Sequence, residues 1–368
     1  MKNLQAVRVT MAFLALATAA RADDTPSLWI LSGQSNACGR AKLPGPAPKP
    51  TVTAFDRTLG RFVVAEDPLP GMNTIGVGPW VAAAQSVARS GVEIRLVGSA
   101  TGGRPISFWH PGEPGHKDLM TSIEAAANGA GIFLWYQGES DALSGIAQAD
   151  YADELKQHVT RVRAQAGNPE LLAVIVQIGS DTRKGWSGYT TLREAQRQFV
   201  LSDRRAILVP SLGRTLKDAV HLDNAGYREL GAEIGRAVLR HRFGKTDVNW
   251  PGPVLDAAAL DDERTGIVAH FAEVEQLAGL DAADFAVIDD EGTVRCTAAA
   301  AGATIVSLQF ERTICLPARL IYGFGQNPRA SLTDETGNRA PGVQLSVTQG
   351  TQVEDKPTAV PNGAGRGQ

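Results

Sequence analysis

The chain has 368 residues, of which three are cysteines, and its formal charge is −3. This length exceeds that of a typical single domain, so we expect one larger and one smaller domain. The near-neutral charge argues against a nucleic-acid-binding protein and against an acidic solvating tail. The cysteine spacings match no metal site, and no metal or other cofactor is predicted.

Residues 1–22 have the pattern of a secretory signal peptide. Lys2 and Arg8 precede a short apolar run, and Ala20-Arg21-Ala22 fits a small-x-small cleavage site. The apolar run is too short to cross a bilayer. We therefore predict export to the periplasm or the medium, without membrane insertion, and a mature chain that begins near Asp23. An N-terminal anchor that is retained is the alternative.

Between residues 23 and 245, strand-like segments alternate with helical patterns. Apolar runs predict strands at 28–31, 92–97, 132–136, 171–178 and 206–209. Helical patterns occur at 79–88, 119–127, 149–166, 191–201 and 224–243, and a small hairpin is expected near 55–64. This alternation predicts an α/β domain with a parallel five-stranded sheet and helices on both faces. Right-handed crossovers then bring the carboxyl ends of the strands to one rim.

The pattern changes after residue 245. Short β-like runs follow at 266–271, 285–288, 304–310 and 318–322, separated by turn signals. We predict a small all-β domain over residues 246–350 and a loose polar tail over 351–368. Cys296 and Cys315 flank two of these runs, and in an exported protein such a pair can form a disulfide. Cys38 is then left over, and we expect it to pack rather than to react.

A polar motif, Gly33-Gln34-Ser35-Asn36, follows the first predicted strand. A serine at this position, beside a glycine that permits a sharp turn, lies where open α/β sheets bind their ligands. Taken alone, the four residues are better explained as a polar turn. A serine hydroxyl is a weak nucleophile until a base removes its proton, so a catalytic interpretation needs a second segment.

Asp218 and His221 supply that acid and base, near the end of the same predicted domain. An imidazole titrates near neutral pH, and a carboxylate at its other nitrogen fixes the tautomer and stabilises the imidazolium. Their spacing brings the two side chains together either in one turn of helix or in a tight loop. The alternative is a capping aspartate beside an ordinary surface histidine. We predict Ser35 as nucleophile, His221 as general base and Asp218 as its orienting acid.

An acyl-transfer site also needs hydrogen-bond donors for the oxyanion. We predict three donors: the backbone N–H of Ser35, a backbone N–H of Gly102 or Gly103, and the side-chain amide of Gln137. These residues follow three predicted strands. A plain turn is the alternative for the glycine pair.

Further residues on the predicted rim are candidates for substrate contact. Arg104 carries a planar fork that suits the carboxylate of an acidic sugar, although a surface salt bridge is the commoner use. Aromatic faces suit sugar rings, but packing in the core explains Trp109 equally well. The candidates are Gln34, Arg104, Trp109 and Glu139, with Trp186 and Tyr189 as further aromatic residues.

These segments, in this order, resemble the SGNH-hydrolase superfamily, in particular its sialate O-acetylesterase and carbohydrate esterase family six branch. The resemblance covers about 27–243 and rests on Gly33-Gln34-Ser35-Asn36, Gly102-Gly103 with Ile106 and Trp109, Gln137-Gly138-Glu139-Ser140-Asp141, and Asp218-x-x-His221. It implies a flavodoxin-like α/β/α sandwich, removal of acetyl groups from sugar hydroxyls, and no metal. It also implies the catalytic roles given above and an oxyanion site formed by Ser35, Gly102 or Gly103, and Gln137.

The second motif departs from that pattern. Arg104-Pro105 follows the glycine pair where relatives commonly carry a small hydroxyl residue, and Phe108 replaces a frequent acidic residue before Trp109. The C-terminal part resembles the β module that ends sialate O-acetylesterase-type proteins.

We therefore predict an exported serine esterase that removes O-acetyl groups from a carbohydrate through an acyl-enzyme. Its expected partner is an acetylated carbohydrate, either sialic acid or a plant or microbial polysaccharide, and not a nucleic acid. The alternatives are an inactive carbohydrate-binding protein on a hydrolase fold, and an SGNH lipid esterase or acyltransferase.

Overall fold

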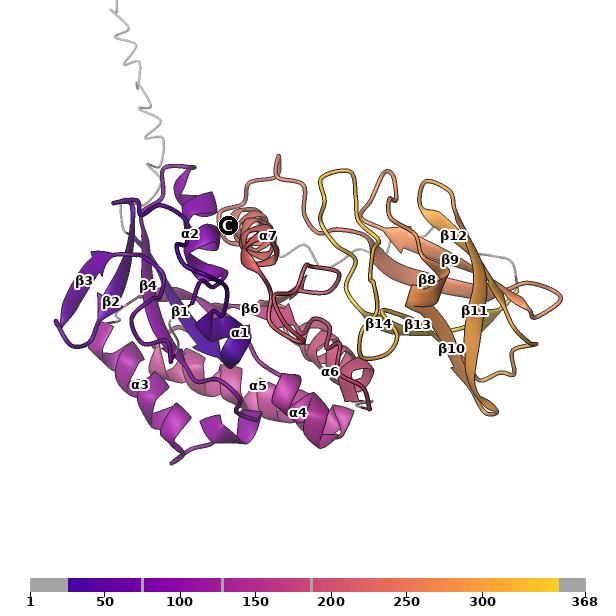
Figure 1. Cartoon of the computed structure of the whole chain (residues 1–368), viewed down its shortest axis with the longest axis horizontal. Helices are drawn as coiled ribbons and strands as arrows, with labels where there is room; N and C mark the ends of the chain where they lie inside the picture. Colours follow the sequence, from indigo (N-terminus) through magenta and orange to yellow (C-terminus); the bar gives the residue numbers. More distant parts are fainter. Residues whose placement is uncertain (1–25, 74–75, 127–128, 186–187, 351–368) are drawn as a thin grey trace, which may run out of the picture.

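The computed structural model describes residues 26–73, 76–126, 129–185 and 188–350 (Figure 1). The predicted signal peptide, the predicted C-terminal tail and Trp186 lie outside these residues. Within the described ranges, every helix is too short or too polar to cross a bilayer.

The first part of the chain forms a seven-stranded sheet. Its order is β3-β2-β4-β1-β5-β6-β7, and neighbouring strands are parallel except for the β2–β3 pair. The prediction of five strands was wrong, because the predicted hairpin joins the same sheet through pairing of β2 with β4. The strands are β1 (Ser27–Gly33), β2 (Val52–Asp56), β3 (Arg61–Val64), β4 (Ile94–Ala100), β5 (Ala130–Tyr136), β6 (Leu172–Gln177) and β7 (Ala206–Pro210).

Helices cover both faces of this sheet, with α2 and α7 on one face and α3 and α5 on the other (Figure 1). The five predicted helices are present, and two short ones, α1 and α4, were not predicted. The helices are α1 (Ser35–Cys38), α2 (Trp80–Ala88), α3 (Pro114–Ala126), α4 (Glu139–Ser144), α5 (Gln148–Gln165), α6 (Gly188–Ser202) and α7 (Asn224–Arg242), with a 3₁₀ turn at Ile106–Trp109.

Helix cover on both faces explains why β5 and β6 are buried along their whole length. On the α2 and α7 face, two glycines allow close helix packing. A methyl group on Gly231 would lie 2.6 Å from the carbonyl oxygen of Pro79, and one on Gly235 would lie 2.6 Å from Cβ of Ser86. Larger side chains at these positions of α7 would push the helix away from α2.

The second part of the chain forms an eight-stranded sheet in the order β14-β13-β10-β11-β12-β9-β8-β15. Only Val347 separates β14 from β15, yet these strands lie at opposite ends of that order. The two ends therefore meet, and the sheet is barrel-like. Its strands are β8 (Val254–Leu260), β9 (Gly266–Ala272), β10 (Phe285–Asp289), β11 (Gly292–Ala301), β12 (Ile305–Phe310), β13 (Arg319–Tyr322), β14 (Val343–Ser346) and β15 (Thr348–Gln349).

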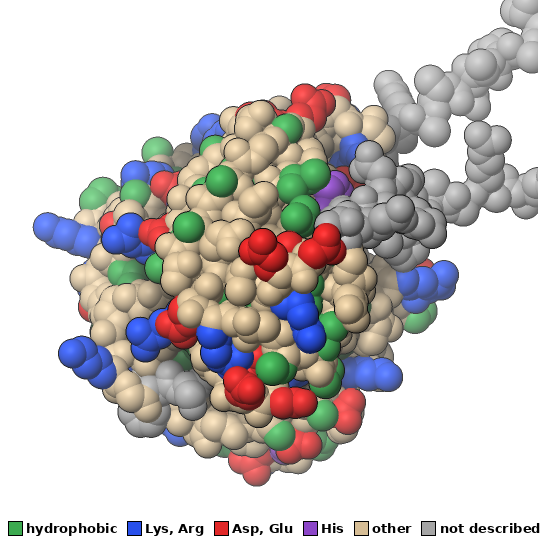
Figure 2. All heavy atoms as spheres, turned by 90° about the vertical axis from the view of Figure 1, so that its right-hand side faces the viewer, with side chains coloured by type: hydrophobic (Ala, Val, Ile, Leu, Met, Phe, Trp, Pro, Cys, Tyr) green, Lys and Arg blue, Asp and Glu red, His purple; other side chains and the backbone are tan. Residues whose placement is uncertain are grey.

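A core of its own fills this second sheet. In β12 the burial alternates strictly, with Val306, Leu308 and Phe310 turned inward. At the outer end, acidic and basic side chains are interspersed and neither sign dominates (Figure 2).

The disulfide considered for Cys296 and Cys315 is absent, since both are free thiols. Asp289 holds the backbone N–H of Cys315 near the β10–β11 turn. Cys296 lies farther along β11, opposite Phe310, and its Sγ donates to the carbonyl of Ala298. Cys38 is buried, and burial raises the pKa of its thiol to about 11, as expected for a residue that packs rather than reacts.

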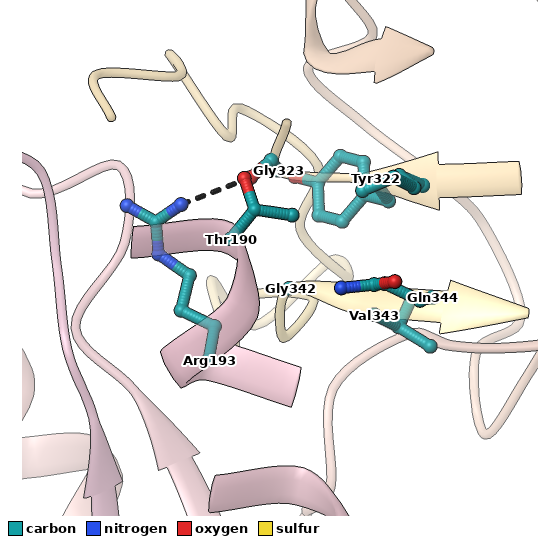
Figure 3. Close-up of a pocket in the computed structure, with 8 residues that line it drawn as sticks. Thr190, Arg193, Tyr322, Gly323, Gly342, Val343 and Gln344 are labelled. Atoms are coloured by element: carbon teal, nitrogen blue, oxygen red, sulfur yellow. Dashed lines mark hydrogen bonds between the residues drawn. The ribbon is translucent and has the colours of Figure 1, made fainter. Parts of the chain in front are cut away.

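Arg193 of α6 connects the two sheets (Figure 3). Its buried guanidinium donates to the carbonyls of Ile178 and Gly179 on one side, and to those of Gly323, Gly325 and Gln326 on the other. Burial lowers its pKa to about 9. The guanidinium thus donates the hydrogen bonds that water would otherwise give to these carbonyls, and it does so for both parts of the chain.

Candidate active site

Ser35 is the first residue of α1, directly after the turn that ends β1. This turn requires Gly33, which has φ of 136° and on which a methyl group would lie 2.1 Å from the carbonyl oxygen of Tyr136. The backbone N–H of Gln34 donates to the same carbonyl at 2.9 Å, so the end of β5 fixes the turn. Ser35 is consequently held at the carboxyl edge of the sheet, as the sequence predicts.

Asp218 and His221 lie in the loop between β7 and α7. The segment forms a tight loop and not a helical turn: the N–H of Lys217 donates to the carbonyl of His221 at 2.8 Å. Nδ1 of His221 lies 2.9 Å from Oδ2 of Asp218, and Nε2 lies 2.9 Å from Oγ of Ser35. The structure thus brings the three predicted side chains into one hydrogen-bonded chain.

The environment of Asp218 favours its ionised form. Desolvation raises the pKa of this carboxyl, but hydrogen bonds from the backbone N–H groups of His221 and Val220 and from the imidazole outweigh it, and the pKa falls to about 2. A charged carboxylate at Nδ1 orients the ring so that Nε2 faces the hydroxyl.

Asn36 anchors the histidine loop to the segment that carries Ser35. Its Nδ2 donates to the carbonyl of Val220 at 3.1 Å, and its Oδ1 accepts from the N–H of Leu222 at 3.3 Å. Val220 and Leu222 are the two neighbours of His221. Tyr227 of α7 adds a hydrogen bond to the same Oδ1 at 2.8 Å. One amide side chain therefore holds the backbone on both sides of the histidine.

Glu139 lies behind Asn36 and is buried, with 3% of its surface exposed. Its Oε1 accepts from Nδ2 of Asn36 at 2.7 Å, whereas its Oε2 has no hydrogen-bond partner among the described residues. Burial raises the pKa of this carboxyl to about 7. Glu139 was a candidate for substrate contact, but in the structure it braces Asn36.

Of the predicted glycine pair, Gly102 borders Ser35. A methyl group on Gly102 would lie 3.4 Å from Cβ of Ser35, whereas one on Gly103 would meet nothing within 4 Å. The same methyl group would lie 2.5 Å from Nη2 of Arg40, so a residue without a side chain is needed for this close packing.

Gln137 does not fit the oxyanion role expected of it. Its side chain is fully buried, and its Nε2 donates to Asp141, to Oε1 of Gln34 at 3.2 Å and to the carbonyl of Arg104 at 3.1 Å. Tyr151 donates to its Oε1 at 2.9 Å. These acceptors engage both hydrogens of the amide, so in this arrangement it braces the turn after β5.

Gln34 has a similar bracing role. Its Oε1 accepts from the backbone N–H groups of Gly138 and Ser140, at 3.3 Å and 3.2 Å, and its side chain is 3% exposed. The expectation of a substrate contact through Gln34 therefore does not match its position, because the amide points into the protein.

Two aromatic candidates are also core residues. Trp109 is 1% exposed and packs edge-on against Trp135, with ring centroids 5.0 Å apart. Tyr189 is fully buried and donates to Asp181 at 2.9 Å. Neither offers a free ring face to a sugar. Arg104 is exposed and lies over the Phe108 ring at 5.0 Å, so of these side chains it alone remains at the surface.

Asn36, Tyr227 and Arg40 were not assigned roles from the sequence. Asn36 is adjacent to Ser35, and that adjacency is the one signal that pointed to it. Arg40 is a partly buried charged residue two positions after the end of α1. Nothing in the sequence near Tyr227 indicated its contact with Asn36.

Among the described residues, no group of three or more His, Cys, Asp and Glu side chains is arranged to hold a metal ion. The functional groups that the structure places together at this rim include the hydroxyl of Ser35, the imidazole of His221 and the carboxylate of Asp218.

The first part of the chain is similar to known carbohydrate esterases. Residues 25–240 match the family model described as carbohydrate esterase, sialic acid-specific acetylesterase. A probable carbohydrate esterase of Arabidopsis thaliana is 29% identical over 240 residues, which is 58% of this chain and 90% of that protein. The crystal structure of the Arabidopsis thaliana protein matches with 28% identity and a TM-score of 0.52, over 58% of this chain and 97% of that one.

A carbohydrate acetylesterase from Xanthomonas citri matches a larger part of the structure, with a TM-score of 0.67 at 18% identity. The match covers 87% of this chain and 80% of that one, so the shared fold extends beyond the first sheet.

Proposed function

This chain belongs to the carbohydrate esterase family described as sialic acid-specific acetylesterases, and on that premise we propose that it removes O-acetyl groups from a carbohydrate through an acyl-enzyme on Ser35. The observation that carries the proposal is the chain of hydrogen bonds from Oγ of Ser35 through His221 to Asp218. Nucleophile, base and orienting acid are within hydrogen-bond reach of one another.

In the first half-reaction, Oγ of Ser35 attacks the acetyl carbonyl carbon while its proton passes to Nε2 of His221. The tetrahedral intermediate collapses, the sugar oxygen leaves with the proton from His221, and the acetyl group stays on Ser35. In the second half-reaction, His221 takes a proton from water, the hydroxide attacks the acyl-enzyme, and acetate leaves as the proton returns to Ser35. Asp218 stabilises the imidazolium in both halves.

The test is hydrolysis of p-nitrophenyl acetate and of acetylated carbohydrates, followed by acetate release, in wild-type protein and in Ser35→Ala. We expect the substitution to remove nearly all turnover, a loss on the order of 10⁶-fold in well-studied serine hydrolases. Activity that survives Ser35→Ala would reject the acyl-enzyme. A wild-type protein that binds acetylated sugars but releases no acetate would be a binding protein, and a preference for long acyl chains would indicate a lipid esterase or acyltransferase.

The same proposal includes export and a two-domain organisation. The pattern of residues 1–22 supports export, and mass spectrometry of the mature protein tests it, with an N-terminus near Asp23 as the expected result. Five parallel strands have the order β4-β1-β5-β6-β7. Numbered along the chain among themselves, they have the order 2-1-3-4-5, which supports a flavodoxin-like sandwich for the first domain. Which acetylated sugar is preferred is decided by a panel that includes sialic acid, xylan and pectin esters.

A further inference from the structure

The guanidinium group of Arg40 lies beside the proposed nucleophile. A methyl group on Gly102 would lie 2.5 Å from Nη2 of Arg40 and 3.4 Å from Cβ of Ser35. Arg40 closely follows the end of α1, the helix whose first residue is Ser35. Arg40, Gly102 and Ser35 therefore border one small space at the carboxyl edge of the sheet.

Arg40 lacks a counter-ion in the part of the chain that the structure describes. Its side chain is partly buried, and its Nε atom is fully buried without a hydrogen-bond partner. A buried donor without a partner and an unpaired cation both destabilise a folded protein. Such a group is expected where a negative charge arrives or develops during function.

The side-chain donor expected for the oxyanion is engaged elsewhere. The amide of Gln137 donates to Asp141, Gln34 and the carbonyl of Arg104. The site therefore lacks the third donor that the sequence predicted. Nε of Arg40 has no hydrogen-bond partner among the described residues, and Nη2 of Arg40 borders the same glycine and the same serine.

We propose that Arg40 stabilises the oxyanion of the acyl-transfer intermediate, an inference that rests on the proposed function. When Oγ of Ser35 bonds to the carbonyl carbon, the π electron pair of that carbonyl moves onto its oxygen, and the hydroxyl proton passes to His221. The guanidinium pairs with this negative oxygen. When the intermediate collapses, the electron pair re-forms the carbonyl and the sugar oxygen leaves with the proton of His221.

This interaction acts on the transition state and not on the bound ester. The ester carbonyl is neutral before attack, so most of the attraction to Arg40 appears only as the oxygen becomes charged. Its removal should therefore lower kcat and leave KM nearly unchanged. The carboxylate of an acidic sugar would also suit a guanidinium, but that use predicts a higher KM and only for charged substrates.

The test compares Arg40→Met with wild-type protein on p-nitrophenyl acetate, a neutral ester without a sugar. We expect kcat to fall by about a hundredfold or more, the usual loss for one oxyanion donor. Arg40→Lys, which keeps the charge but not the fork, should recover part of that loss. A second readout needs no turnover: methylboronic acid forms a tetrahedral anionic adduct with an active serine, and its affinity should fall in parallel.

Arg95→Met is the matched control. Arg95 lies near the start of β4, opposite Leu28 and over the Phe62 ring, whereas Gly102 follows the other end of that strand. This variant loses the same charge and should keep wild-type kcat and methylboronic acid affinity. Thermal unfolding verifies that each variant is folded, and Arg40→Gln replaces Arg40→Met if the latter is not.

Two results would overturn the proposal. One is an Arg40 variant that hydrolyses p-nitrophenyl acetate and binds methylboronic acid within about threefold of wild type, since the loss of a donor exceeds that. The other is a loss confined to acidic sugar esters and seen as a higher KM, which assigns Arg40 to substrate recognition. The proposed function fails on different results: activity that survives Ser35→Ala, or a wild-type protein that releases no acetate.

Discussion

Oγ of Ser35 lies 2.9 Å from Nε2 of His221, although the two residues are 186 positions apart in the chain. Ser35 follows β1, whereas His221 follows β7, and β5 and β6 lie between these strands in the sheet. The loop after β7 must therefore reach back across the rim. The contacts that hold this loop, and not strand adjacency, determine whether imidazole and hydroxyl meet.

Asn36→Ala removes the hydrogen bonds to Val220 and Leu222 on both sides of His221. We expect kcat on p-nitrophenyl acetate to fall by about a hundredfold, because a shift of about 1 Å in a catalytic group has that effect, while KM changes little. Asn168→Ala is the matched control, since Asn168 also bonds the backbone through both side-chain atoms but near the start of β5. Equal kcat values in the two variants would contradict the role given to Asn36.

Asp218→Asn should lower kcat on the order of 10⁴-fold, the loss that the corresponding change causes in serine proteases, because the amide favours the wrong imidazole tautomer. The pKa of Asp218 is lowered to about 2, so its ionised form persists well below neutral pH. The pH profile of wild-type kcat/KM between pH 4 and 9 should therefore show no step from this carboxyl. A step that disappears in Asp218→Asn would contradict that assignment.

Glu139 should make wild-type stability depend on pH. Its pKa is raised to about 7 by burial, above the value of about 4.3 for an exposed glutamate. A raised pKa in the folded state stabilises the protein below the unfolded pKa, and this contribution is lost as pH rises through the folded pKa. Stability should therefore fall between about pH 4.5 and pH 7.

Glu139→Gln isolates this contribution, because the amide keeps an acceptor for Asn36 and cannot ionise. We expect the variant to lose less stability than wild type between pH 5 and pH 8, by an amount on the order of 2 kcal/mol. Asp67 also has a raised pKa but is present in both proteins, so its effect cancels. Asp141, whose pKa is raised as well, lies close enough to Glu139 to interact with its charge, so its effect cancels only in part. Urea unfolding at the two pH values measures the difference, and parallel pH dependences would refute the prediction.

Arg193→Met should destabilise the protein by about 3 kcal/mol or more, because each buried carbonyl left without a donor costs about 1 kcal/mol or more. The affected carbonyls belong to both parts of the chain. Urea unfolding followed by fluorescence should show a lower midpoint. Arg329→Met, at an exposed ion pair with Asp281, is the control and should leave the midpoint nearly unchanged.

The catalytic segments could be predicted from the sequence because each of them follows a recognisable strand. The segment with Ser35 and the segment with Asp218 and His221 follow apolar strands, and parallel connections bring strand ends to one rim. The five longer helices were predicted from local helical patterns, such as apolar residues that repeat with the helical period. The hairpin of β2 and β3 was expected, but its pairing with β4 depends on tertiary contacts that no local pattern encodes.

The direction of a side chain was not predictable in the same way. Gln137 and Trp109 lie in the expected segments, yet both point into the protein. A residue at a strand end faces the rim or the core according to which partners surround it, and for Gln137 those partners come from three other segments. The roles of Asn36 and Arg40 follow from tertiary contacts. Asn36 contacts the loop that carries His221, and Arg40 lies beside Gly102.

The most direct test of the account is the site and rate of covalent labelling by a fluorophosphonate, followed by peptide mass spectrometry. The account predicts a single adduct on Ser35, and labelling slowed on the order of a hundredfold or more in His221→Ala, because the imidazole is the base that activates the hydroxyl. An adduct on another residue, or labelling of His221→Ala at the wild-type rate, would contradict it.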